Sequence, residues 1–112
     1  MPKIYNKLVR DKIPEIIAQQ GKSVSFRALK GDELKAALKD KLIEEAYELV
    51  NAETEEQIIE EAVDVLEVLY RIIGVFISNG GFPKVDFFKV EKCKEKGAFI
   101  KGYFLESVGD EQ

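Results

Sequence analysis

The chain of 112 residues contains no histidine and a single cysteine, Cys93. One cysteine cannot form an internal disulfide, and one thiol without any histidine provides too few ligands for a structural zinc site. The absence of histidine also excludes a histidine general base and the Glu-x-x-His ligands of di-iron helical bundles. Any hydrolytic chemistry must therefore depend on carboxylates, lysines, tyrosines or a metal ion.

Long apolar segments and a basic surplus are missing as well. The apolar stretch from Val63 to Ile77 is interrupted by Asp64, Glu67 and Arg71, so it does not reach membrane-spanning length. The first residues, MPKIYNKLVRDK, lack the apolar core of a signal peptide. A net charge of −4 argues against general nucleic-acid binding, which usually requires a basic surplus. We expect a cytoplasmic protein with neither a membrane nor a nucleic acid as its partner.

The overall composition is typical of one small globular domain. Hydrophobic residues make up 46% of the chain and charged residues 34%, and the length suffices for one modest core. We therefore expect a single domain over residues 1–112. We find no internal repeat, low-complexity segment or glycine-rich phosphate loop.

Start and stop signals predict two helices in the first half of the chain. Asp11 can cap a short helix that ends near Gln20, just before a glycine. Asp32 is the expected N-cap of a second, longer helix that continues to Ala52 and is rich in alanine, leucine, lysine and glutamate.

The third expected helix is apolar around most of its circumference. Thr54 and Gln57 form a capping box at its start, and it is expected to run to about Ser78. A helix that packs against one partner needs an apolar stripe on only about a third of its circumference. This short chain has few other elements to cover the remaining surface. We therefore expect a homo-oligomer with this helix in its interface.

The C-terminal part is expected to hold a fourth helix and a short extended segment. The helix begins at Pro83 and ends at Gly97. Residues 98–105, AFIKGYFL, are aromatic and β-prone, so we expect a short strand or hairpin there.

Two pairs of acidic residues stand on either side of the break near residues 51–54. Glu45 and Glu48 are three residues apart, as are Glu61 and Asp64, and this spacing puts both members of each pair on one side of a helix. Two antiparallel helices would bring all four carboxylates together. At about 100° per residue, Glu45 falls within the apolar sector of its helix, while Glu44 lies further round.

Two interpretations of these acids compete. Most glutamates on a helix are solvated surface residues, and 21 acidic residues make chance pairs inevitable. Carboxylates in line with apolar neighbours are costly to bury, however, unless something pairs with them. A divalent cation would relieve the repulsion, and ligands that are all oxygen suit Mg²⁺, or alternatively Mn²⁺. We favour the cation site.

The acidic pattern resembles a known signature. Glu44-Glu45-x-x-Glu48, followed after twelve residues by Glu61-x-x-Asp64, resembles the EExxE…ExxD motif of the MazG-type nucleotide pyrophosphohydrolases, the all-α NTP pyrophosphatase superfamily. The opening YNKLVRDKIPEII and the ending KEKGAFIKGYFL look like the two ends of a MazG-like subgroup related to phosphoribosyl-ATP pyrophosphohydrolase.

The resemblance implies an oligomeric, all-α MazG-like bundle with active sites near subunit interfaces. It implies Mg²⁺-dependent cleavage of NTPs or dNTPs between the α and β phosphates, giving a nucleoside monophosphate and pyrophosphate in nucleotide-pool housekeeping. The implied metal ligands are Glu45, Glu48, Glu61 and Asp64, with Glu44 as a further catalytic acid. The implied phosphate contacts are Lys7, Arg10, Lys94 and Lys101.

Alternatives stay open at this point. One is the same reaction on phosphoribosyl-ATP in histidine biosynthesis, and another is a non-catalytic helical oligomerisation module. The residues alone also leave open the preferred base and sugar, the choice between dimer and tetramer, the number of metal ions, and which acid activates the water.

Overall fold

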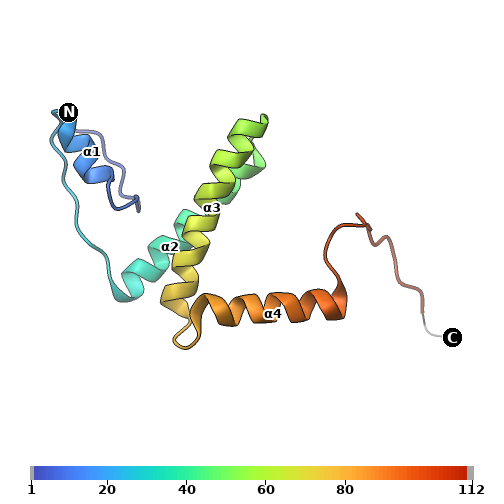
Figure 1. The fold of residues 1–112 in the computed structure, drawn as a ribbon. Coiled ribbons are helices and arrows are strands. Elements are labelled where there is room, and N and C mark those ends of the chain that lie inside the picture. Colours follow the sequence, from blue (N-terminus) through green and yellow to red (C-terminus); the bar gives the residue numbers. More distant parts are fainter. Residues whose placement is uncertain (1, 111–112) are drawn as a thin grey trace.

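Two antiparallel helices joined by a short turn form the centre of the fold (Figure 1). In the computed structural model, which describes residues 2–110, α2 spans Gly31–Val50 and α3 spans Glu55–Phe76. A short α1, Ile13–Gln19, precedes them, and α4, Gly81–Lys96, follows. The prediction of an all-α chain with four helices is thus confirmed over the described residues. None of these helices is long and apolar enough to cross a bilayer.

The predicted capping box fixes the start of α3. The backbone N–H of Gln57 donates to Oγ1 of Thr54 over 3.1 Å, and the backbone N–H of Thr54 donates to Oε1 of Gln57 over 3.3 Å. On the other side of the turn, Nδ2 of Asn51 donates to the carbonyl of Tyr47 over 2.8 Å and closes the end of α2. These bonds satisfy backbone groups that helix termini leave without partners, so the chain reverses sharply between α2 and α3.

The two aspartates predicted as N-caps do not cap their helices. The N-cap residues are Lys12 for α1 and Lys30 for α2, and neither makes a side-chain capping bond. Asp32 lies one residue inside α2, where it faces the positive end of the helix dipole instead. For α1, Pro14 in the first turn provides the starting geometry without help from Asp11.

The predicted C-terminal strand is wrong, since none of residues 2–110 is in a strand. Within 98–105 the chain makes a turn at residues 99–101, and the N–H of Gly102, at φ 62°, donates to the carbonyl of Phe99 over 3.4 Å. A strand is stabilised by pairing with another strand. This segment lies beyond α4, away from the helical hairpin (Figure 1), and so has no backbone to pair with.

The chain buries little apolar surface by itself. Among the described residues, only Leu38 and Ile73 are apolar and buried. The radius of gyration is 19.2 Å and the longest dimension is 70 Å. A compact chain of this length has a radius of gyration of about 13 Å. Large apolar side chains on α2, α3, α4 and the C-terminal segment are therefore left at the surface.

Candidate metal centre

Three carboxylates from α2 and α3 meet where the two helices pack. Glu45 on α2, and Glu61 and Asp64 on α3, each offer one oxygen, and these oxygens all lie within 4.8 Å of one another. The i, i+3 spacing on α3 turns Glu61 and Asp64 to the same side, and the reversal at residues 51–54 brings that side against α2. The predicted meeting of acids from two antiparallel helices is thus seen for these three residues.

Two oxygens of this cluster have no hydrogen-bond partner. Glu45 is 6% exposed, and its Oε2 is buried without any donor in reach. Oε2 of Glu61 is buried and unpartnered in the same way. Leaving the buried carboxylate oxygen of Glu45 unsatisfied costs at least about 1–3 kcal/mol. The arrangement is therefore unfavourable unless a proton or a cation is bound there.

The pKa of Glu61 also indicates that the carboxylates of this cluster repel one another. Burial raises the pKa of this carboxyl, and the negative charge of the nearby Glu48 raises it further. Asp64 and Glu45 add to the effect. A shared proton and a bound cation are two ways to relieve the same repulsion between crowded carboxylates.

Glu48, the fourth predicted ligand, borders the cluster without joining it. Its side chain is exposed, yet it lies close enough to Glu61 to raise the pKa of that group. The fifth acid, Glu44, is turned toward lysines: its Oε1 lies 3.2 Å from Nζ of Lys7 and 3.5 Å from Nζ of Lys41. Partial burial acts to raise the pKa of Glu44, but the bond from Lys7 and the charge of Lys41 outweigh it, so that pKa is lowered.

Lys41 was not predicted from the sequence. Its Nζ lies 3.2 Å from Oε1 of Glu45, and its side chain is only 16% exposed. It neutralises the outer side of Glu45 while the other oxygen of that carboxylate points inward unpartnered. The signal was present, because Lys41 precedes Glu45 by four residues and Glu44 by three, the spacings at which helical side chains meet.

The N-terminal segment supplies two more cations at the edge of the cluster. Nη2 of Arg10 donates to Oδ1 of Asp64 over 2.6 Å, and Nη1 lies 3.8 Å from a carboxylate oxygen of Glu67. Lys7 reaches Glu44, as described. Asn6 has a φ of 44°, a backbone conformation that asparagine tolerates better than most residues. A hollow of about 80 Å³, lined by residues of this segment and of α2 including Lys7, Lys41 and Glu44, lies beside the contact.

The other two predicted phosphate contacts lie elsewhere. Lys94 pairs with Glu91 on its own helix over 3.4 Å, and Lys101 lies 5.8 Å from the ring centroid of Tyr103. α4 leads away from the α2–α3 hairpin, and the C-terminal segment follows at its far end (Figure 1). The chain therefore brings Lys7 and Arg10 to its own acids but not Lys94 or Lys101.

The fold and the site together define an α-helical hairpin with a cluster of three carboxylates between its helices. No family model matches the chain, and no solved structure matches it. The chain is similar to a protein of Mycolicibacterium smegmatis (strain ATCC 700084 / mc(2)155) whose name is "uncharacterized protein". The two are 46% identical over 54 residues, or 48% of this chain and 55% of that protein. The chain thus spans about half the length of this relative.

Proposed function

We propose that this chain is a Mg²⁺-dependent nucleotide pyrophosphohydrolase whose metal ligands are Glu45, Glu61 and Asp64, with Glu48 beside them. One observation carries the proposal: Glu45 and Glu61, on different helices, belong to one cluster of carboxylates, and each holds a buried oxygen without a hydrogen-bond partner. The resemblance of the acidic pattern and of both chain ends to MazG-type enzymes favours a nucleotide as the substrate. Such a reaction fits a cytoplasmic nucleotide pool.

The donor set fits the ion. All the groups on offer are carboxylate oxygens, which Mg²⁺ prefers and Mn²⁺ accepts. The three carboxylates offer oxygens within 4.8 Å of one another, so these side chains are the ones that would hold the cation.

The substrate would bind with its phosphates toward the cluster. When bound, the cation supplies positive charge to phosphate oxygens and lowers the pKa of a water molecule. Lys7 and Arg10, at the edge of the cluster, add counter-charge to the triphosphate. Water then adds across the anhydride between the α and β phosphates, giving a nucleoside monophosphate and pyrophosphate.

Glu48 suits the role of proton acceptor for the attacking water. Its carboxylate is exposed to solvent and lies beside Glu61. Glu44, the other remaining acid, is held by Lys7 and Lys41, which lower its pKa, so it accepts a proton less readily than an ordinary glutamate. The role of Glu44 would then be to hold these lysines in place.

Arg10 would change partner during the reaction. Its guanidinium now occupies an oxygen of Asp64, the same residue that is proposed to bind the cation. If that oxygen of Asp64 held a cation, Arg10 would lose its partner and could bind a phosphate, for which its planar fork is well shaped.

A pyrophosphate-release assay tests the proposal. All common NTPs and dNTPs, and phosphoribosyl-ATP in parallel, are incubated with the protein in Mg²⁺ and in EDTA, with Asp64→Asn as the control for contaminating activity. Mg²⁺-dependent release from one or more NTPs or dNTPs is the expected result. A clear preference for phosphoribosyl-ATP would contradict the housekeeping role, and no release from any substrate would contradict the enzyme itself.

A further inference from the structure

The outer face of α3 carries an apolar stripe that stays exposed in the described part of the chain, residues 2–110. Ile59, Val63 and Leu66 follow one another at i, i+4 and i+7, the spacing of one helix face. Their side chains are 57%, 53% and 51% exposed. At about 100° per residue this stripe lies on the side of α3 opposite to Glu61 and Asp64, which face α2. α3 is thus apolar on the side turned away from its partner helix.

The stripe has an acidic edge. Glu56 and Glu60 lie about 60° to 100° round the helix from Ile59, along the same side of the stripe. Both are exposed, and neither forms an ion pair within residues 2–110. The surface therefore combines apolar side chains with free negative charge, and we call it the α3 stripe.

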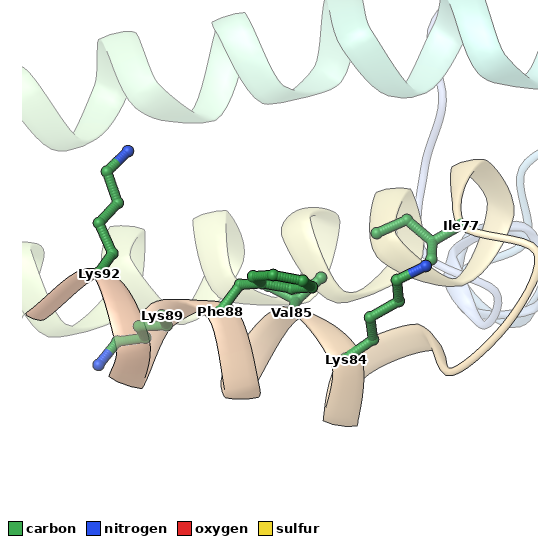
Figure 2. A pocket seen from close by; sticks show the side chains of 6 residues that line it. All are labelled: Ile77, Lys84, Val85, Phe88, Lys89 and Lys92. Carbon is green, nitrogen blue, oxygen red and sulfur yellow. The ribbon is translucent and has the colours of Figure 1, made fainter. Parts of the chain in front are cut away.

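A surface of the opposite character lies along α4. An open groove of about 510 Å³ has an apolar floor and a rim of lysines, formed by Ile77, Lys84, Val85, Phe88, Lys89 and Lys92. Figure 2 shows Val85 and Phe88 between Lys84 on one side and Lys89 and Lys92 on the other. None of these three lysines pairs with an acid in the described part of the chain. We call this surface the α4 groove.

The two surfaces complement each other in both charge and polarity. One presents apolar side chains beside Glu56 and Glu60, and the other presents an apolar floor between lysines. Both are open in the single chain, so they do not cover each other there. Complementary charge steers association and fixes its register, while the apolar area supplies the main driving force.

We propose that a second copy of this chain lays its α3 stripe in the α4 groove of the first, and that a two-fold axis makes the exchange reciprocal. With such an axis each copy donates one stripe and accepts one, so the pairing closes instead of growing into a filament. The extended shape of the single chain, 70 Å in its longest dimension, leaves α4 free to reach across to a second copy. This pairing does not depend on the enzymatic proposal.

A charge-exchange experiment tests the pairing. One variant carries Glu56→Lys and Glu60→Lys on the stripe, and the other carries Lys89→Glu and Lys92→Glu at the groove. Each variant alone brings like charges together at both contacts, so its dimer dissociation constant should rise by at least about tenfold. Mixed in equal amounts, the two variants restore opposite charges at both contacts and should associate again.

Sedimentation equilibrium at low salt measures the association, and far-UV circular dichroism checks that each variant keeps its helices. Lys22→Glu, the same type of charge change on an exposed loop, is the matched control and should leave the association unchanged. The wild type should be a dimer, or a larger assembly that dissociates on disruption of this contact. A monomeric wild type would overturn the proposal. So would a groove variant that assembles normally, because pairing of stripe with stripe does not need the α4 lysines.

Cross-linking gives a second, independent test on the wild-type chain. Chains labelled with ¹⁵N are mixed with unlabelled chains, and a carbodiimide joins amines to carboxylates that are in contact. We expect mixed-isotope links between Lys89 or Lys92 and Glu56 or Glu60. Mixed-isotope links that involve only other lysines and acids would contradict the proposed pairing.

Discussion

Replacement of Glu45 by glutamine should have opposite effects on stability with and without Mg²⁺. Oxygens of Glu45 and Asp64 lie within 4.8 Å, where two like charges repel by about 1 to 3.5 kcal/mol for effective dielectric constants of 80 to 20. Glutamine has nearly the same shape and removes this repulsion. It also removes the ion pair with Lys41, but Lys41 keeps Glu44 as a partner, so no unpaired charge is left and the loss is about 0.5–1 kcal/mol. In EDTA the variant should therefore be as stable as the wild type or up to about 3 kcal/mol more stable.

In Mg²⁺ the order should reverse. A ligand that binds only the folded state at 100 times its dissociation constant stabilises that state by about 2.7 kcal/mol. For a chain of about 100 residues this gain raises the midpoint of thermal unfolding by about 10 to 20 °C. Glu45→Gln lacks one of the three proposed anionic ligands, so it should gain only a small part of this increase.

Far-UV circular dichroism at 222 nm is the suitable measurement, since the chain has no tryptophan to report by fluorescence. Unfolding is followed in EDTA and in MgCl₂ at one protein concentration, because association also contributes to stability. Glu44→Gln is the matched control: it loses its bonds to Lys7 and Lys41 in both solutions but should keep the shift with Mg²⁺. Equal destabilisation of Glu45→Gln in both solutions would refute the reasoning, as would a wild type that does not respond to Mg²⁺.

Four further predictions follow from the same cluster and from the second-copy interface. Asp64→Asn and Glu48→Gln should each lower the rate of pyrophosphate release by at least about 100-fold and leave the circular dichroism spectrum unchanged. Loss of the helical signal in both variants would show that these acids are structural instead. Arg10→Ala should tighten Mg²⁺ binding, because it removes the group that competes for Asp64. The same variant should raise the KM for nucleotide about tenfold, because it loses a phosphate contact. Titration calorimetry and steady-state kinetics would show whether the two effects occur together. The pKa of Glu61 is raised above its ordinary value of 4.5, so between that value and the raised pKa the folded metal-free protein binds more protons than the unfolded chain. Its stability should fall, and its Mg²⁺ affinity should rise, as the pH increases through that window; calorimetry at several pH values would contradict this if affinity were flat there. Dilution below the dissociation constant of the dimer should weaken Mg²⁺ binding, and equal affinity in monomer and dimer would show that the two are not linked.

The parts of the fold that local chemistry determines could be predicted from the sequence. The capping box at Thr54 and Gln57 is local, and it fixed the start of α3 correctly. The strand prediction for residues 98–105 was wrong because a strand depends on distant parts of the chain. These residues are β-prone, but none of residues 2–110 forms a strand with which they could pair. Propensity describes what a segment tolerates, while pairing depends on where distant elements lie.

In the candidate site, too, the features set by local helix geometry could be predicted, and those set by tertiary packing could not. The helical phase of Glu45 predicted its position inside the apolar sector, and it is buried. The pairing of Arg10 with Asp64 could not be predicted, because these residues are 54 positions apart and the path of the N-terminal segment over the hairpin depends on packing. The contact of Lys41 with Glu45 is predictable from the sequence, because the two residues are four positions apart on one helix.

α3 is the element on which both proposals meet. One face carries carboxylates that repel one another, and the opposite face carries apolar side chains in contact with water. Neither face is stabilised by the single chain, in which Leu38 and Ile73 are the only buried apolar residues described. A cation would offset the repulsion between the carboxylates, and a second copy of the chain would cover the exposed apolar side chains. Because a helix is rigid, a cation that fixes the rotation of α3 against α2 also fixes the direction of the α3 stripe. The first partner to bind orders α3, so the second partner loses less conformational entropy when it binds. For this reason we expect metal binding and assembly to strengthen each other.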